Sequence, residues 1–187
     1  NVRTADSSIG NAVSIGGVAY FAADDGLHGR ELWKSDGTVT GTVMVMDINP
    51  SGDSYVDELT TVNGMLYFRA NNGTLGDELW KSNGTLAGTV MVRDIFTGTD
   101  SSELSNLTAM SGTLYMQANN GVTGHELWKS DGTLTGTVMV KDINPSGGAY
   151  PDDLTTVNGM LYFSADGGTL GGELWKSDGT VTGTVMV

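Results

Sequence analysis

The sequence contains no cysteine, which excludes disulfide bonds, thiolate metal sites and cysteine nucleophiles. It has only 2 histidines among 187 residues. His28 lies three residues before Glu31 and His125 one residue before Glu126, so the histidines do not form a repeated pair. A catalytic triad or a zinc site therefore has little support. No stretch approaches the roughly 18 to 20 apolar residues that a membrane helix needs, and we expect no membrane insertion.

Positive charge is scarce as well, because 9 Lys and Arg residues oppose 22 Asp and Glu residues, for a net charge of −13. Such a chain repels a phosphate backbone, so we expect no nucleic-acid partner, whereas cations such as calcium are favoured. The abundant residue is glycine, at 28 copies against 3 prolines. Together with frequent Thr, Val and Asn-Gly or Asp-Gly pairs, this composition is typical of many short strands joined by tight turns.

The octapeptide ELWKSDGT at 31–38 recurs as ELWKSNGT at 78–85 and as ELWKSDGT at 126–133 and 173–180, so the repeat spacing is 47 or 48 residues. Each unit contains four short apolar segments bounded by turn signals, and pairs such as Asn63-Gly64 and Asn158-Gly159 are typical of hairpins. No segment has a sustained helical period. We therefore expect a single repeat domain, 1–187, of four antiparallel four-stranded units at roughly 1–46, 47–93, 94–141 and 142–187.

A four-stranded unit of this length has the size of one β-propeller blade. Leu66, Tyr67 and Phe68 are consecutive, so both faces of their strand are apolar, as in a sheet packed between two others. The predicted fold is an all-β propeller of four four-stranded antiparallel blades of 47–48 residues, and we favour a closed four-bladed ring. Two alternatives stay open: half of an eight-bladed dimeric ring, or an open arc of a larger repeat protein.

The repeated tryptophans fit two interpretations, stacking against a sugar or wedging between adjacent blades. We favour the wedge, because a large side chain that recurs once per blade buries roughly 150–250 Å² there. The Asp-Gly or Asn-Gly pair then forms the turn that leaves the tryptophan strand. A structural role in the repeat is assigned to Glu31, Trp33, Asp36, Gly37, Glu78, Trp80, Asn83, Gly84, Glu126, Trp128, Asp131, Gly132, Glu173, Trp175, Asp178 and Gly179.

The segment DINPSGDSYVDE, 47–58, places oxygen-bearing side chains in the pattern of a calcium loop, and DINPSGGAYPDD, 142–153, repeats it. In the equivalent segment between them, Phe96 stands where a donor is needed. The alternative, which we favour, is a connection between blades in which Asp and Asn satisfy nearby backbone groups. The candidate calcium ligands are Asp47, Asn49, Ser51, Asp53, Glu58, Asp142, Asn144, Ser146 and Asp153.

The repeated motif resembles the bacterial ELWxxDGT repeat family in Glu31, Leu32, Trp33, Asp36, Gly37 and Thr38, with Asn83 in place of the aspartate in the second copy. The resemblance covers nearly the whole chain. It implies a propeller-like repeat of a secreted or surface protein of bacteria and no established enzyme activity.

We therefore expect a non-enzymatic extracellular or cell-surface module for adhesion or recognition. It would require no cofactor, and its partner would be a glycan or another cell-surface ligand, with calcium as an organiser of the loops. One alternative is a structural subunit that binds copies of itself in a filament, sheath or surface layer. A polysaccharide hydrolase or lyase is the least favoured alternative, because an enzyme usually breaks its own repeat at the reacting residues. The loops at 24–30, 47–58, 119–125 and 142–153, where the repeats differ, are the expected binding region.

Overall fold

The computed structural model describes residues 12–169 and 171–187. These residues form sixteen strands in four four-stranded antiparallel sheets, each with its strands in chain order. The first sheet contains β1 (Val13–Ile15), β2 (Val18–Asp24), β3 (Arg30–Ser35) and β4 (Val43–Met46). The second contains β5 (Asp57–Val62), β6 (Met65–Asn71), β7 (Asp77–Ser82) and β8 (Val90–Arg93). The third contains β9 (Ser105–Met110), β10 (Thr113–Asn119), β11 (His125–Ser130) and β12 (Val138–Lys141). The fourth contains β13 (Asp152–Val157), β14 (Met160–Asp166), β15 (Gly172–Ser177) and β16 (Val185–Met186).

The expected all-β arrangement of four propeller blades is thus confirmed, and each sheet falls within one expected repeat unit. The hairpins form where the sequence predicts them. Asn63 and Gly64 both have positive φ, at 51° and 77°, and Asn158 and Gly159 repeat this geometry at 50° and 78°. Two successive positive φ values match the twist of antiparallel strands, which explains the preference for Asn-Gly at these positions.

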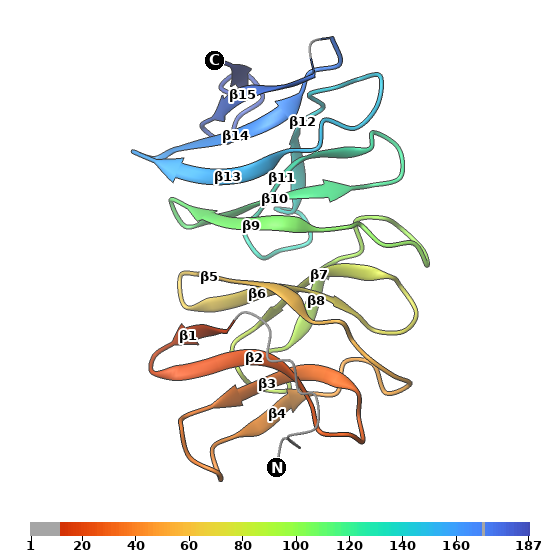
Figure 1. Ribbon diagram of the computed structural model, residues 1–187, viewed down its shortest axis with the longest axis vertical. Coiled ribbons are helices and arrows are strands. Elements are labelled where there is room, and N and C mark those ends of the chain that lie inside the picture. The colour runs from red at the N-terminus through yellow and green to blue at the C-terminus, as the bar shows by residue number, and fades with distance from the viewer. Residues whose placement is uncertain (1–11, 170) are drawn as a thin grey trace.

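In residues 12–169 and 171–187 the blades are arranged in an open arc, and the closed ring that we favoured from the sequence is not observed there. Contacts between sheets run through neighbouring first strands, β1 with β5, β5 with β9 and β9 with β13. The first and fourth blades consequently lie at opposite ends of the long axis (Figure 1). Each blade is offset from the previous one along this axis, and the three steps from the first blade to the fourth do not bring the ends together (Figure 1).

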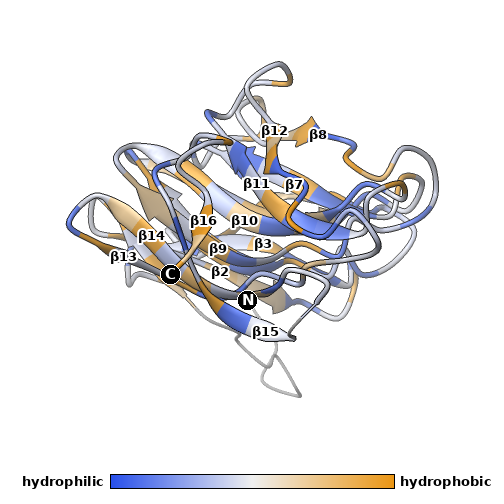
Figure 2. Cartoon of the chain, turned by 90° about the horizontal axis from the view of Figure 1, so that it is seen from above, coloured by the Kyte–Doolittle hydropathy of each residue, from blue (hydrophilic) through white to orange (hydrophobic). Residues whose placement is uncertain are grey.

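The hydrophobic core is divided among the junctions between blades. One buried cluster joins the first and second blades, a second joins the second and third, and a third joins the third and fourth. Seen along the long axis, hydrophobic residues lie on strands such as β8, β12 and β16 (Figure 2). Since each cluster draws on two neighbouring blades, stability is expected to depend on nearest-neighbour contacts, as in other repeat proteins.

Candidate functional site

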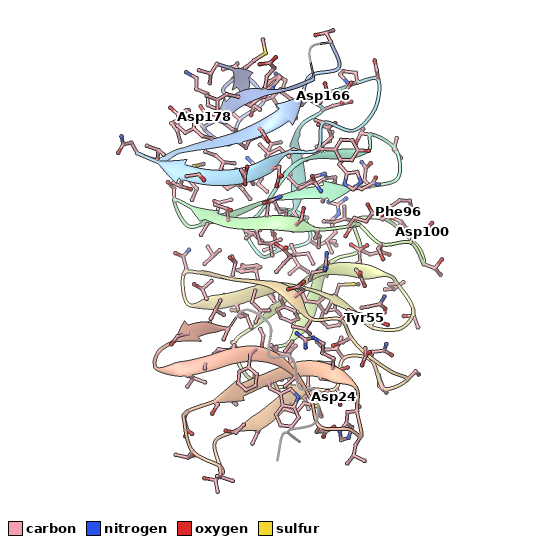
Figure 3. All side chains as sticks on the ribbon, in the orientation of Figure 1. Asp24, Tyr55, Phe96, Asp100, Asp166 and Asp178 are labelled. Atoms are coloured by element: carbon pink, nitrogen blue, oxygen red, sulfur yellow. The ribbon has the colours of Figure 1, made fainter. Side chains whose placement is uncertain are left out.

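The connectivity of each blade sends its loops to two opposite edges of the arc. Because strands alternate in direction, the loop between the second and third strands leaves the same edge as the connection to the next blade. Figure 3 shows Asp24, Tyr55, Phe96, Asp100 and Asp166 along this edge, and Asp178 toward the other one. We call the first of them the loop edge, made of residues 24–29, 47–56, 71–76, 94–104, 119–124, 142–151 and 166–169 with 171.

The repeated octapeptide joins one blade to the next. Trp80 lies in the buried cluster with Leu32 of the preceding blade, and the same relation holds for Trp128 and Trp175. The four tryptophans expose only 4 to 8 % of their surface, so their rings are not available for stacking against a sugar. Arg93 lies over the Trp128 ring at 5.8 Å, and Lys141 over the Trp175 ring at 5.6 Å.

The lysine of each octapeptide also reaches the next blade. Lys34 Nζ donates to the Gly84 carbonyl at 2.7 Å, and the same bond recurs from Lys81 to Gly132 and from Lys129 to Gly179. The aspartate or asparagine of the motif shapes the turn that holds this glycine. The Asp36 carboxylate accepts from the Thr38 N–H and hydroxyl, and these hydrogen bonds hold its pKa below the usual range. The motif therefore builds a rigid turn and aims its carbonyl at the preceding blade.

Glycine is required in this turn wherever another blade covers it. Gly84 has φ +83°, and a Cβ there would overlap the Tyr20 hydroxyl; Gly37 has φ +89° but open space around its Cβ position. Gly37→Ala is expected to cost about 1 kcal/mol for backbone strain alone. Gly84→Ala adds the collision with Tyr20 and is expected to cost about 3 kcal/mol. Urea unfolding of the two variants measures this difference. An equal loss of unfolding free energy in both variants would show that the Tyr20 side chain moves aside at no energetic cost.

The glutamate of the motif is buried at the junction and holds the connection between blades. Glu78 Oε2 accepts from the Ile95 N–H at 2.7 Å, and Oε1 accepts from Ser102 N–H at 3.1 Å and Phe96 N–H at 3.4 Å. Glu31 and Glu126 bond equivalent connections through the N–H groups of Ile48 and Ile143. Each of these three side chains belongs to a residue that is 0 % exposed.

Burial raises the pKa of Glu31, Glu78 and Glu126 to about 7, although the backbone hydrogen bonds oppose the shift. An aspartate that begins the connection adds to the rise through its negative charge. One oxygen of that aspartate is buried without a hydrogen-bond partner, as seen at Asp47, Asp94 and Asp142. Each junction therefore contains two neighbouring carboxyl groups, one of which readily holds a proton near neutral pH.

The candidate calcium ligands point to separate backbone partners. Asn49 Oδ1 accepts from Ser51 N–H, Asp53 Oδ1 accepts from Arg30 N–H, and Glu58 lies at a β-bulge, where Oε2 accepts from Leu107 N–H at 3.4 Å. Asn144 Oδ1 accepts from Ser146 N–H in the second segment. In residues 12–169 and 171–187, no group of three or more His, Asp or Glu side chains is placed to hold a metal ion. The described residues therefore contain no site that supports the calcium hypothesis.

Two exposed tyrosines on the loop edge were not singled out from the sequence. Tyr55 and Tyr150 are 57 % and 59 % exposed, and each has φ +50°. A bulky residue rarely adopts this conformation, which is costly unless the surroundings impose it. The only signal in the sequence is their common spacing, eight residues after Asp47 and Asp142 respectively. In the middle connection, Glu103 takes the same backbone conformation, with φ 49°.

Polar side chains lie beside Tyr150 and in the first loop of the same edge. The His125 ring stacks on Tyr150 with a centroid separation of 4.7 Å, and its Nε2 lies 3.0 Å from Glu103 Oε2. At the first loop, His28 Nδ1 lies 2.8 Å from Asp25 Oδ2, and this hydrogen bond raises the histidine pKa. The loop edge therefore offers two exposed tyrosines, and the Tyr150 ring stacks on an imidazole that in turn contacts a carboxylate.

The similarity of this chain to known proteins lies in its fold and not in its sequence. No protein-family model and no curated protein matches the sequence. A puromycin hydrolase structure superposes with a TM-score of 0.65 at 14 % identity, over 97 % of this chain and 29 % of that one. A prolyl endopeptidase structure gives a TM-score of 0.63 at 13 % identity, over 99 % and 27 %. The chain thus spans less than a third of either protein, and likeness at this identity shows a shared β-propeller-type arrangement of blades.

Proposed function

We propose that this chain is a non-enzymatic, extracellular or cell-surface recognition module that binds glycans through its loop edge. The single observation that carries the proposal is the pair of exposed tyrosines, Tyr55 and Tyr150, held at φ +50° at equivalent positions of two connections. A tyrosine ring combines an apolar face with a polar hydroxyl, which suits the apolar faces and hydroxyl groups of a sugar. Two equivalent contact points favour multivalent binding of weak individual sites.

Several features favour binding over catalysis. The buried glutamates recur at three junctions and hold backbone N–H groups, which is a structural use of their oxygens. On the loop edge, Asp24 and Asp25 accept from the N–H groups of Gly26, Leu27 and His28.

The location outside the cell rests on the resemblance to ELWxxDGT repeat proteins. No helix in the described residues is long and apolar enough to cross a membrane.

A glycan array followed by titration of the best ligand tests the proposal. We expect Tyr55→Ala and Tyr150→Ala each to weaken binding roughly 10-fold, or about 1.4 kcal/mol, and the double variant to abolish it. Leu134→Ala is the matched control, because this side chain is 63 % exposed but lies on the opposite edge. Each titration is run with calcium and with EDTA, which separately tests calcium as an organiser. A wild-type protein that binds no glycan, or tyrosine variants that bind like wild type, would contradict the proposal.

A further inference from the structure

The same backbone bridge occurs at all three junctions of the loop edge. One residue of each connection donates its N–H to the first residue of the preceding blade's third strand, and its carbonyl accepts from the last residue of the next blade's second strand, at 2.8–3.1 Å. These bridging residues are Ser54, Ser102 and Ala149. The residues that follow them, Tyr55, Glu103 and Tyr150, consequently occupy one equivalent position at each junction.

Tyr55, Glu103 and Tyr150 form a row of exposed side chains. Their φ values are 50°, 49° and 50°, so the backbone turns in the same way at each junction. The two tyrosines are 57 % and 59 % exposed, and the Glu103 side chain is 63 % exposed. Each of the three residues lies between two described blades, and Figure 3 shows Tyr55 on the loop edge. Since packed sheets lie about 10 Å apart, the two tyrosines are separated by a distance on the order of 20 Å.

Glu103 and Tyr150 are linked by direct contacts. Glu103 Oε2 lies 3.0 Å from His125 Nε2, and the His125 ring stacks on Tyr150 with a centroid separation of 4.7 Å. Within residues 12–169 and 171–187, Glu103 Oε1 accepts no hydrogen bond. A carboxylate oxygen accepts hydrogen bonds from hydroxyl groups, and bonds to a charged acceptor are stronger than neutral ones. The row therefore offers an aromatic ring, an acceptor for hydroxyl groups and a second aromatic ring in succession.

The charge of the loop edge excludes one class of glycan. Its segments contain no lysine or arginine and nine acidic residues, Asp24, Asp25, Asp47, Asp53, Asp94, Asp100, Glu103, Asp142 and Asp166. A surface lined by charges of one sign repels a ligand of the same sign. A polysaccharide of uronic acids or sulfated sugars would bring carboxylates or sulfates against this edge. The row of exposed side chains therefore suits a chain without acidic groups.

We propose that a single linear polysaccharide chain without acidic groups lies along the loop edge, with its sugars stacked on Tyr55 and Tyr150 and its hydroxyl groups donating to Glu103 between them. The inference rests on the proposed glycan binding and adds the length, the direction and the charge of the ligand. After the first tyrosine is engaged, the second meets the same ligand molecule at a high effective concentration. A short oligosaccharide reaches only one of the two tyrosines and gains nothing from the other.

Titrations with oligosaccharides of two lengths test the span. The probes are the disaccharide and the octasaccharide of laminarin, mannan, xylan and starch, with hyaluronan octasaccharide as the acidic probe. In at least one neutral series we expect the wild-type chain to bind two disaccharides but one octasaccharide, the latter roughly 100-fold more tightly. Tyr55→Ala and Tyr150→Ala are each expected to weaken octasaccharide binding roughly 10-fold and to leave one disaccharide site. Hyaluronan octasaccharide is expected not to bind.

Glu103→Ala tests the contact between the two tyrosines. It is expected to weaken octasaccharide binding roughly 5-fold and to leave disaccharide binding unchanged. Asp100→Ala is the matched control, because Asp100 is exposed in the same connection and its loss changes the net charge equally. Equal effects of the two substitutions would show that only the charge matters and would overturn the contact at Glu103. Melting temperatures check that each variant folds.

The remaining outcomes separate this inference from the proposed function. An octasaccharide that binds no more tightly than its disaccharide would overturn the single chain along the edge, although each tyrosine could still bind a sugar. Hyaluronan that binds as tightly as the neutral chains would overturn the exclusion of acidic ligands. If the glycan array yields a ligand and none of the linear series binds, the inference is wrong and the proposed function stands. A silent array overturns both.

Discussion

Glu78→Ala is expected to lower the free energy of unfolding by about 3–5 kcal/mol, because the buried N–H group of Ile95 and the partly buried one of Phe96 lose their acceptor and a cavity forms at the junction. Glu78 is 0 % exposed, and its bond to Ile95 N–H is 2.7 Å long. The connection from β8 to β9 carries the chain into the third blade, so its loosening affects two blades at once. Urea or thermal unfolding of the purified variant measures the loss.

Glu173→Ala is the matched control, because the fourth copy of the same motif holds no connection among the described residues. Glu173 is partly exposed, and its side chain has no hydrogen bond to backbone N–H groups within the described residues. We expect a change within about 0.5 kcal/mol, as for an ordinary surface substitution. If both substitutions lower the free energy of unfolding by the same amount, the role assigned to the Glu78 carboxylate at the junction is wrong. The glutamate would then stabilise only its own blade.

The fold could be predicted from the sequence because the repeat shows its main features four times. The spacing of the octapeptide indicated four units, and pairs such as Asn63-Gly64 marked the hairpins, which the positive φ values confirm. Local chemistry decides these features, so a local pattern reveals them. The consecutive apolar residues 66–68 indicated a sheet covered on both faces, and Leu66 and Phe68 are indeed 0 % exposed.

The open arc and the exposed tyrosines could not be predicted in the same way. Closure depends on the small rotation between successive blades, and no single residue in the sequence encodes that angle. Leu32 and Leu174 have the same neighbours in sequence, yet one is buried and the other is half exposed, because only the position in the arc distinguishes them. Nothing in the sequence distinguishes Tyr55 from the other residues of its connection, because its exposure and positive φ come from the path of the chain.

Stability is expected to decrease as the pH rises from about 5 to about 7, because three buried glutamates ionise over this range. Burial raises the pKa of Glu31, Glu78 and Glu126 from 4.5 to about 7. Between these values the folded chain keeps protons that the unfolded chain has released, so raising the pH favours unfolding. The loss is on the order of 3 kcal/mol per glutamate, is complete slightly above pH 7 and is absent below about pH 4.

A second set of carboxylates limits stability on the acid side. Asp36, Asp131 and Asp178 have pKa values below the usual 3.8 because each accepts hydrogen bonds from a threonine of its turn. Their contribution is present above that pH and is lost as the pH falls through the lowered pKa values. Together the two sets place the expected maximum of stability near pH 5, between the loss of the turn hydrogen bonds and the ionisation of the buried glutamates.

Chemical unfolding at pH 5, 6, 7 and 8 measures the effect, and glutamine variants assign it. Glutamine keeps one oxygen that accepts from Ile95 N–H but cannot ionise, so Glu78→Gln should remove about a third of the pH dependence and the triple variant nearly all of it. Repulsion among the many surface carboxylates also grows with pH, but at about 1 M salt it is screened over about 3 Å, whereas buried groups are screened much less. A slope that disappears in salt, or that survives in the triple variant, would place its origin on the surface and not at the junctions.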